Sequence, residues 1–338
     1  MTIQKNISLK QFNTFRVEAF AKYFCEVNNL SELKSLITTD HFENEQKLIL
    51  GGGSNILFTK DFNGIVIKNC IGGIEVISES KDNVLLEVGA GHDWDELVEY
   101  TVNNGFYGLE NLSLIPGTVG ASPIQNIGAY GVEVKDVIES VKGLSLESFE
   151  QKVFSNSECN FGYRDSIFKT KLKNKFIVTS VVFSLSKNGK VNTNYKAIEN
   201  YISEKKLSKV TPSEVRNAVI AIRRSKLPDP REIGNAGSFF KNPVISNNKY
   251  EEIKSNYSDL NGYQVDDSSV KISAGWLIDK CGLKGKRVND VGVYEKQALV
   301  IVNYGNSTGG EILEFSDLII SNVYNKFNIE LVKEVNII

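Results

Sequence analysis

The sequence predicts a protein that contains both helices and strands and is built from more than one domain. Helix and strand signals alternate along the chain. Its 338 residues exceed what one ordinary hydrophobic core holds, which favours two or three domains. Two glycine clusters stand beside apolar segments, a pattern typical of backbone that lies against a ligand.

The first predicted elements occupy residues 31 to 105. Residues 31–38 read as a short helix, and 48–50 read as a short buried strand that runs into a glycine turn. A β-rich segment covers 84–88. A second helix opens at 93–100, and Gly105 can end it because glycine readily adopts the left-handed conformation found beyond helix ends.

A clear helix start stands at Thr211, after a β-rich segment at 176–185. Thr211 as the N-cap, Pro212 in the first turn and Glu214 three residues after the cap form a capping box. The two prolines within 227–230 cannot continue the helix, so we expect a domain boundary there. Beyond it the pattern predicts a helix at 274–281 and a strand at 298–302. A long amphipathic helix at 307–325 and a final strand at 329–337 follow.

The longest glycine-rich segment covers residues 115–131, reads IPGTVGASPIQNIGAYG and carries no charged side chain. Because glycine lacks a Cβ, such backbone can bring N–H groups close to a flat ring or a phosphate. Each glycine alone would fit a tight turn of a β-rich domain. Together in one uncharged segment they favour a cofactor site, and they are Gly117, Gly120, Gly128 and Gly131.

A second glycine cluster, GGGSN at 51–55, follows the strand at 48–50. Successive N–H groups in such a turn form a concave anion site, and the Ser54 hydroxyl and Asn55 amide add donors. No Lys-Ser or Lys-Thr follows, which excludes a Walker loop, and Ile56 replaces the last glycine of the dinucleotide-binding pattern. The cluster therefore predicts a phosphate-binding turn.

Charge and residue counts exclude several classes of protein. The net charge of −2 gives no sign of nucleic-acid binding, and no apolar stretch is long enough for a membrane span. Without an apolar N-terminal leader we expect a cytoplasmic protein. The 4 cysteines lack C-x-x-C spacing and only His41 and His92 are present, so we expect no disulfides, no metal site and no histidine-based triad.

Several motifs together resemble the MurB family of UDP-N-acetylenolpyruvoylglucosamine reductases, and the resemblance covers essentially the whole chain. The motifs are NTFR at 13–16, GGGSN, IPGTVGASPIQNIGAYG, GYRDS at 162–166, KLPDP at 226–230, GNAGSFFKNP at 234–243 and KQALV at 296–300. The NYK segment at 194–196 is similar to the extra tyrosine loop of the longer subclass of this family.

The resemblance implies an α+β fold of three domains that binds FAD without a covalent bond. Two domains form an FAD-binding fold of the vanillyl-alcohol-oxidase or PCMH type. The first covers 1–72 and is completed by the C-terminal strand 326–338, and the second covers 73–225. A third α+β domain at 226–325 binds substrate. The implied FAD-binding residues are Gly51, Gly52, Gly53, Ser54, Asn55, Pro116, Gly117, Thr118, Gly120, Ala121, Gly128, Ala129 and Tyr130.

The implied reaction is the NADPH-dependent reduction of UDP-N-acetylglucosamine enolpyruvate to UDP-N-acetylmuramate, a precursor of the peptidoglycan cell wall. NADPH first reduces FAD, flavin N5 then delivers a hydride to C3 of the enolpyruvyl group, and C2 receives a proton. NADPH and the sugar nucleotide use one pocket in turn. The resemblance implies a monomer, with no nucleic-acid or membrane partner.

Three catalytic residues are implied by the family motifs. Arg164 would hold the substrate carboxylate, Ser238 would give the proton to C2, and Glu334 matches the remaining catalytic position. Each also has an ordinary interpretation: a surface salt bridge, a turn serine bonded to local backbone, and a solvated charge near a chain end. The sequence departs from the family at Asn336, where an arginine is common.

Substrate binding is implied for four polar side chains suited to a sugar nucleotide. They are Tyr195, Lys226, Asn242 and Gln297. Each has an ordinary interpretation: Tyr195 as a loop aromatic that packs on its own domain, Lys226 as a charge favoured at a helix C-terminus, Asn242 as a turn residue and Gln297 as a polar group at a strand edge.

Two other functions remain open from the sequence. An FAD-dependent oxidase of the same fold would share both glycine clusters, although His92 is the one candidate to tether a flavin and we interpret it as structural. A binding module could instead hold a nucleotide without turnover.

Overall fold

The computed structural model describes residues 1–338, which form two compact units. Unit 1 contains Met1–Ile7, Phe20–Gly53 and Phe62–Ser225, and unit 2 contains Ser8–Ala19, Ser54–Asp61 and Lys226–Ile338. Each unit is therefore assembled from segments that are distant in the sequence. The division into three domains stays a prediction.

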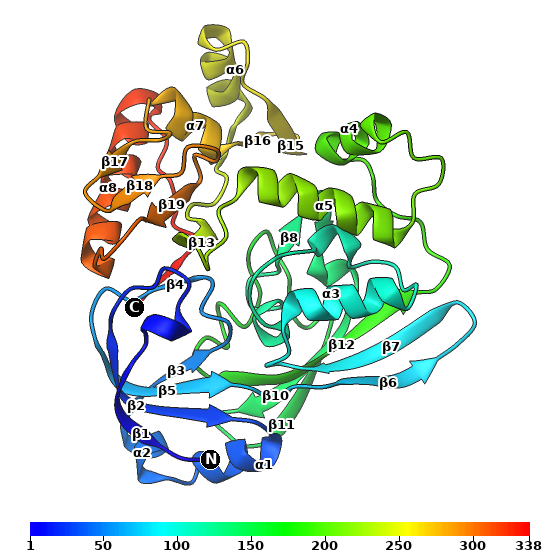
Figure 1. Ribbon diagram of the computed structural model, residues 1–338, viewed down its shortest axis with the longest axis vertical. Helices are drawn as coiled ribbons and strands as arrows, with labels where there is room; N and C mark the ends of the chain where they lie inside the picture. Colours follow the sequence, from blue (N-terminus) through cyan, green and yellow to red (C-terminus); the bar gives the residue numbers. More distant parts are fainter. The chain divides into compact units, whose positions relative to one another are not determined.

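The first sheet of unit 1 has four strands, three of which run parallel as consecutive neighbours. In spatial order the strands are β1 (Gln4–Ser8), β2 (Phe20–Val27), β5 (Phe62–Asn69) and β3 (Gln46–Leu50). Helices α1 (Leu30–Leu36) and α2 (Asp40–Asn44) lie beside this sheet (Figure 1). Their Leu33, Leu36 and Phe42 side chains are buried in one core with residues of β2 and β5. The predicted helix at 31–38 and strand at 48–50 are confirmed.

The second sheet of unit 1 is antiparallel and contains five strands. In order they are β11 (Gln151–Ser155), β10 (Ile138–Ser145), β12 (Phe176–Ser186), β7 (Asn83–Gly89) and β6 (Ile74–Glu79). Helix α3 (Trp94–Asn103) packs on it through fully buried Trp94, whose indole N–H donates to Leu112 O at 2.9 Å. Gly105 follows with φ +71°, so the predicted helix end is confirmed.

Two further helices of unit 1 share a small apolar core. They are α4 (Lys196–Glu204) and α5 (Pro212–Lys226), with Ile198, Val215 and Val219 buried between them. Helix α5 begins at Pro212 as predicted, and the Glu214 carboxylate accepts from the Thr211 N–H at 3.0 Å. A hairpin of β8 (Gly128–Ala129) and β9 (Val132–Glu133) and three 3-10 turns complete the unit, at Glu110–Leu112, Val119–Ala121 and Val134–Asp136.

Unit 2 is a second α+β body with its own core. Its strands are β4 (Ile56–Leu57), β13 (Gly234–Ser238), β14 (Val244–Ser246), β15 (Gly262–Asp266), β16 (Ser269–Ile272), β17 (Arg287–Val288), β18 (Val291–Val293), β19 (Val300–Asn303) and β20 (Asn336–Ile337). Its helices are α6 (Asn247–Asn256), α7 (Ala274–Lys280), α8 (Gly309–Phe327) and the 3-10 turn Lys10–Phe12. Phe15 and Leu57, from early segments, lie in the same core as Phe239, Ile278 and Ile319.

The predicted final strand at 329–337 is wrong over most of its length. Only Asn336–Ile337 forms a strand, β20, which pairs in parallel with β4. The alternation that suggested a strand reflects burial, because Ile329, Leu331 and Val335 are all buried. The backbone between them forms one isolated bridge, Phe240 to Lys333, because its neighbouring segments change along its length.

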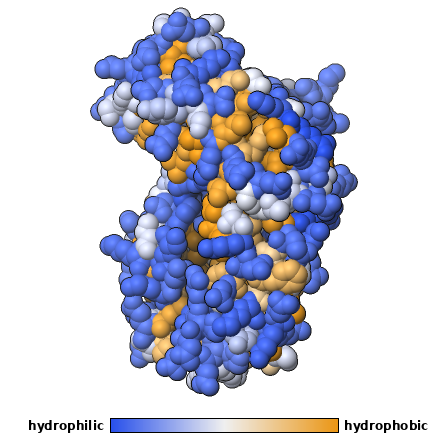
Figure 2. Space-filling view, turned by 90° about the vertical axis from the view of Figure 1, so that its left-hand side faces the viewer, coloured by the Kyte–Doolittle hydropathy of each residue, from blue (hydrophilic) through white to orange (hydrophobic).

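Hydrophilic side chains cover most of the face shown in Figure 2, and apolar side chains gather in patches between them. No helix is long and apolar enough to cross a membrane.

Candidate active site

The two glycine clusters meet within unit 1. A Cβ on Gly52 would lie 2.7 Å from Gly117 Cα, and a Cβ on Gly51 would lie 2.5 Å from Thr118 Oγ1. Real Cβ atoms essentially never approach backbone so closely. Close packing of the two segments therefore requires glycine here, and it places the predicted phosphate turn directly beside the predicted ring site.

The longer glycine segment is fixed by the residues that precede α3. The Val119 N–H donates to His92 O at 2.9 Å and the Gly120 N–H donates to Ala90 O at 2.8 Å. A Cβ on Gly120 would lie 2.5 Å from Ala90 Cβ. His92 therefore supports the longer glycine segment through its backbone carbonyl, in agreement with a structural role.

The residues of this region fit an FAD group. Gly53 and Gly117 have φ values of +64° and +129°, which only glycine adopts readily, so the turn can present successive N–H groups. The Gly52 N–H has no hydrogen-bond partner within the protein. An uncharged segment with available N–H donors suits a pyrophosphate and a flat ring system.

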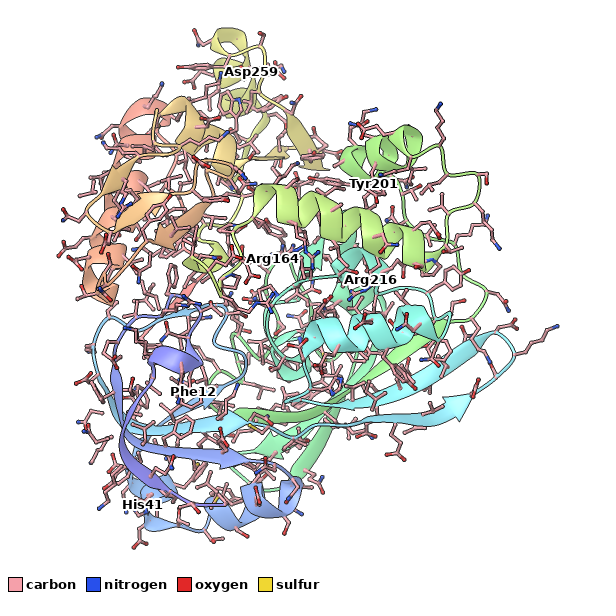
Figure 3. The ribbon with its side chains drawn as sticks, in the orientation of Figure 1. Phe12, His41, Arg164, Tyr201, Arg216 and Asp259 are labelled. Atoms are coloured by element: carbon pink, nitrogen blue, oxygen red, sulfur yellow. The ribbon has the colours of Figure 1, made fainter.

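Arg164 lies against the same glycine segment. Its Nη2 donates to Gly128 O at 2.5 Å and its Nη1 donates to Asn126 O at 3.3 Å, while the Asn126 amide donates back to Gly162 O at 2.9 Å (Figure 3). Asn126, Tyr130 and Arg164 have φ values of +44°, +50° and +54°. Residues other than glycine that adopt such positive φ values have a strained backbone, and such strain is concentrated at functional sites.

A tyrosine pair links the predicted cofactor segment to the predicted substrate loop. The Tyr130 and Tyr195 rings contact edge to face, with centroids 5.2 Å apart. Tyr195 stands at the start of α4 and is 40% exposed. Burial raises the pKa of Tyr130 despite the nearby positive charge of Arg223, so the phenol stays neutral at physiological pH.

Arg223, on α5, was not predicted from the sequence. Its Nε donates to Leu114 O at 3.2 Å, and burial lowers its pKa, which the nearby Tyr130 phenol and Asp95 oppose. The signal available was spacing, since Arg216 and Arg223 are two helical turns apart and lie on one face of α5. Two arginines on a face that otherwise packs inward indicate buried partners.

Arg216 makes a two-point contact with Asp95 of α3 (Figure 3). Its Nη1 donates to Asp95 Oδ1 at 2.6 Å and its Nη2 donates to Oδ2 at 3.1 Å. Asp95 Oδ1 also accepts from the Leu114 N–H at 2.5 Å. Burial alone would raise the pKa of Asp95, but these hydrogen bonds and the Arg216 charge bring the pKa below its usual range.

In unit 2, Ser238 stands at the end of β13 after a local irregularity. The register of β13 against β19 shifts between Asn235 and Ser238, and Gly237 has φ +68°. The Asn235 side chain accepts from the Gly237 N–H at 2.9 Å and thereby holds this bulge. A bulge redirects the next side chain, and Ser238 is exposed.

Glu334 lies next to the Ser238 strand. Its N–H donates to Phe239 O at 2.8 Å, and its carbonyl accepts from the Asn55 amide at 3.4 Å. The Asn336 amide donates to Asn55 O at 2.9 Å. Asn336 therefore ties the C-terminal segment to the end of the GGGSN turn.

Asn242 and Gln297 meet at the first turn of α7. Asn242 Oδ1 accepts from the Ala274 N–H at 3.0 Å, and a Cβ on Gly275 would lie 3.2 Å from Gln297 Oε1. The Phe239 N–H donates to Leu299 O at 2.8 Å, which brings this pair near Ser238. Lys226 ends α5 with an exposed side chain. Unit 2 therefore contains the predicted residues Ser238, Asn242, Gln297 and Glu334, and also Ser54, Asn55 and Lys226.

Comparison with known proteins shows the family. Residues 229–338 match the C-terminal domain of UDP-N-acetylenolpyruvoylglucosamine reductase, and residues 21–146 match an FAD-binding domain. The UDP-N-acetylenolpyruvoylglucosamine reductase of Flavobacterium johnsoniae is 50% identical over 339 residues and covers 100% of both chains. The chain belongs to the UDP-N-acetylenolpyruvoylglucosamine reductase family. A further reductase of this family, from Bacteroides fragilis, is 45% identical and covers 99% of this chain and 100% of its own.

A solved structure supports the same assignment. The crystal structure of the MurB reductase from Thermus caldophilus has a TM-score of 0.70, 25% identity, and covers 100% of this chain and 99% of its own. The predicted membership of the reductase family, the α+β fold class and the FAD cofactor are confirmed. The roles of the individual site residues stay predictions.

Proposed function

We propose that this chain reduces UDP-N-acetylglucosamine enolpyruvate to UDP-N-acetylmuramate with NADPH, for peptidoglycan synthesis. The observation that supports the proposal most directly is the pairing of the Ser238 strand with the Glu334 segment through the 2.8 Å hydrogen bond to Phe239 O. It places two catalytic candidates that are almost 100 positions apart in the sequence on neighbouring backbone segments.

The chemistry asks for a cation, a proton donor and a hydride source. When bound, FAD supplies the hydride. Arg164 would hold the substrate carboxylate, because a planar guanidinium binds a carboxylate at two points and stabilises the negative charge that builds up during reduction. Its contacts with Asn126 O and Gly128 O would fix the guanidinium plane beforehand.

Ser238 would hold the proton that reaches C2, and Glu334 would orient the Ser238 hydroxyl. A serine hydroxyl is a weak acid, so it can protonate only a strongly basic carbon and must be held at the correct position. The bulge at Gly237, locked by Asn235, supplies a rigid position for it. Asn242 and Gln297 would bind the phosphates of the sugar nucleotide as neutral donors.

The experiment separates the two halves of the reaction. Ser238→Ala should leave bleaching of the flavin by NADPH intact in rapid-mixing absorbance, while recolouring by the enolpyruvyl sugar slows by a factor on the order of 10²–10⁴. Ser321→Ala, at an exposed position of α8, is the matched control and should change neither half. An equal loss in both halves would reject the role of Ser238.

The same measurement also tests the two alternatives that the sequence alone left open. A flavoprotein that reacts with oxygen but not with the enolpyruvyl sugar would be the oxidase, and a yellow protein that NADPH does not bleach would be the binding module. The monomeric state and the cytoplasmic location predicted from the sequence remain part of the proposal.

A further inference from the structure

Lys68 lies at the carboxyl end of β5, beside the first glycine of the GGGSN turn. In the parallel register of the sheet Lys68 is the partner of Leu50, the last residue of β3. Its Nζ donates a hydrogen bond to the Gly51 carbonyl. Ligands of open parallel sheets bind outside the carboxyl ends of the strands, so the lysine lies at the edge where an anion would be held.

The Lys68 ammonium has no carboxylate partner. It makes no ion pair, and Glu26, its register partner on β2, is exposed. Burial lowers the pKa of Lys68, and Glu26 and the half-buried Cys70 only partly oppose this. Half-buried charges are normally paired, so an unpaired ammonium beside an anion-binding turn indicates that the missing negative charge comes from a ligand.

The hydrogen bond also orients the turn. In a trans peptide the carbonyl and the following N–H point in opposite directions, so holding the Gly51 carbonyl on the Lys68 side turns the Gly52 N–H to the other side. That N–H has no partner within the protein. The packing of Gly52 on Gly117 prevents the peptide from turning over freely.

We propose that Lys68 positions the pyrophosphate of the flavin cofactor in two ways. Its hydrogen bond holds the Gly51–Gly52 peptide so that the Gly52 N–H points toward the phosphate, and its ammonium places a positive charge on the opposite side of that peptide. The inference rests on the proposed function only in requiring FAD as the ligand. Lys68 lies outside every motif of the sequence. It supplies the positive charge near the phosphate that the glycines cannot supply, because they carry no charge.

The test compares ligands with and without phosphate. Binding of FAD and of riboflavin to flavin-free protein is measured by fluorescence quenching for the wild type, Lys68→Met, Lys68→Arg and the control Lys142→Met. Lys142 is also a half-buried lysine on a strand of unit 1, but it pairs with Glu87 at 2.6 Å. Riboflavin has the same ring and no pyrophosphate, so its binding reports that each variant is folded.

Loss of one charge-assisted interaction should raise the FAD Kd of Lys68→Met by about tenfold, with riboflavin binding unchanged. Lys68→Arg should recover most of the affinity for FAD, and added salt should weaken FAD binding less in Lys68→Met than in the wild type. Unchanged FAD binding, or equal losses for FAD and riboflavin, would overturn the inference alone. A wild type that binds neither ligand would overturn the proposed function and the inference with it.

Discussion

Gly52→Ala is the most direct test of how the two glycine clusters work together. The new Cβ would lie 2.7 Å from Gly117 Cα and 3.2 Å from Gly117 C, and both atoms belong to backbone. A flexible side chain could move aside, but backbone anchored by the Val119 and Gly120 hydrogen bonds cannot. The substitution must therefore separate the phosphate turn from the ring segment.

The size of the effect follows from overpacking. Forcing one extra carbon into a close-packed contact costs about 1–3 kcal/mol, and each kcal/mol lowers Tm by roughly 2–4 °C in a domain of 150–250 residues. We expect Tm of the flavin-free protein to fall by several degrees. We also expect the FAD Kd to rise by at least about tenfold, because both segments that hold the cofactor shift.

Gly72→Ala is the matched control, since the nearest atom to a Cβ there is Cys70 O at 3.9 Å. Tm is measured by differential scanning calorimetry on flavin-free protein, and FAD binding by fluorescence. If Gly52→Ala and Gly72→Ala gave the same Tm and the same affinity, the proposed contact between the two clusters would be wrong.

Three further predictions concern Arg164, Asp95 with its partner Arg216, and the buried thiols. Arg164→Lys loses one of two contacts to backbone carbonyls and should lower turnover by roughly 10–100-fold; near-normal turnover would contradict it. Because the pKa of Asp95 is lowered in the folded state, its stabilisation is complete above the unfolded pKa of about 3.9 and is lost as pH falls through the lower folded pKa. Asp95→Asn should therefore lower Tm at pH 7 and flatten the acid side of the Tm–pH profile, whereas an unchanged profile would show that the contact with Arg216 contributes nothing. Burial raises the pKa of Cys25 and Cys159 to about 12, so neither should react with iodoacetamide at pH 8 until the protein unfolds, as peptide mass spectrometry can show.

The sequence was most informative where local chemistry alone decides the structure. The start of α5 follows from a proline and a glutamate next to a threonine, and the end of α3 from a glycine with positive φ. The two glycine clusters were predicted separately. Gly51 and Gly52 require glycine because the longer segment packs against them, whereas Gly120 of the longer segment packs against Ala90. Family motifs extended these predictions to the side chains of the site.

The rest depends on tertiary contacts that no local pattern encodes. Lys68 and Arg223 look like ordinary charges in the sequence, and only the strand register and the path of α5 bring them to the glycine clusters. The extent of the final strand was mispredicted for a related reason. The alternation of apolar residues at 329–337 indicates burial correctly. A strand also needs one continuous hydrogen-bonded partner strand, and this segment instead bonds to different parts of the chain along its length.

The assembly of unit 2 from three separate segments has a consequence for how the protein is made. Residues 8–19 and 54–61 leave the ribosome early, yet the core around Phe15 and Leu57 is completed only by residues after Lys226. At about 5–20 residues per second, synthesis of the remainder of the chain after these early segments takes on the order of 15–60 s. During that interval the apolar side chains of the two early segments lack the core that later buries them.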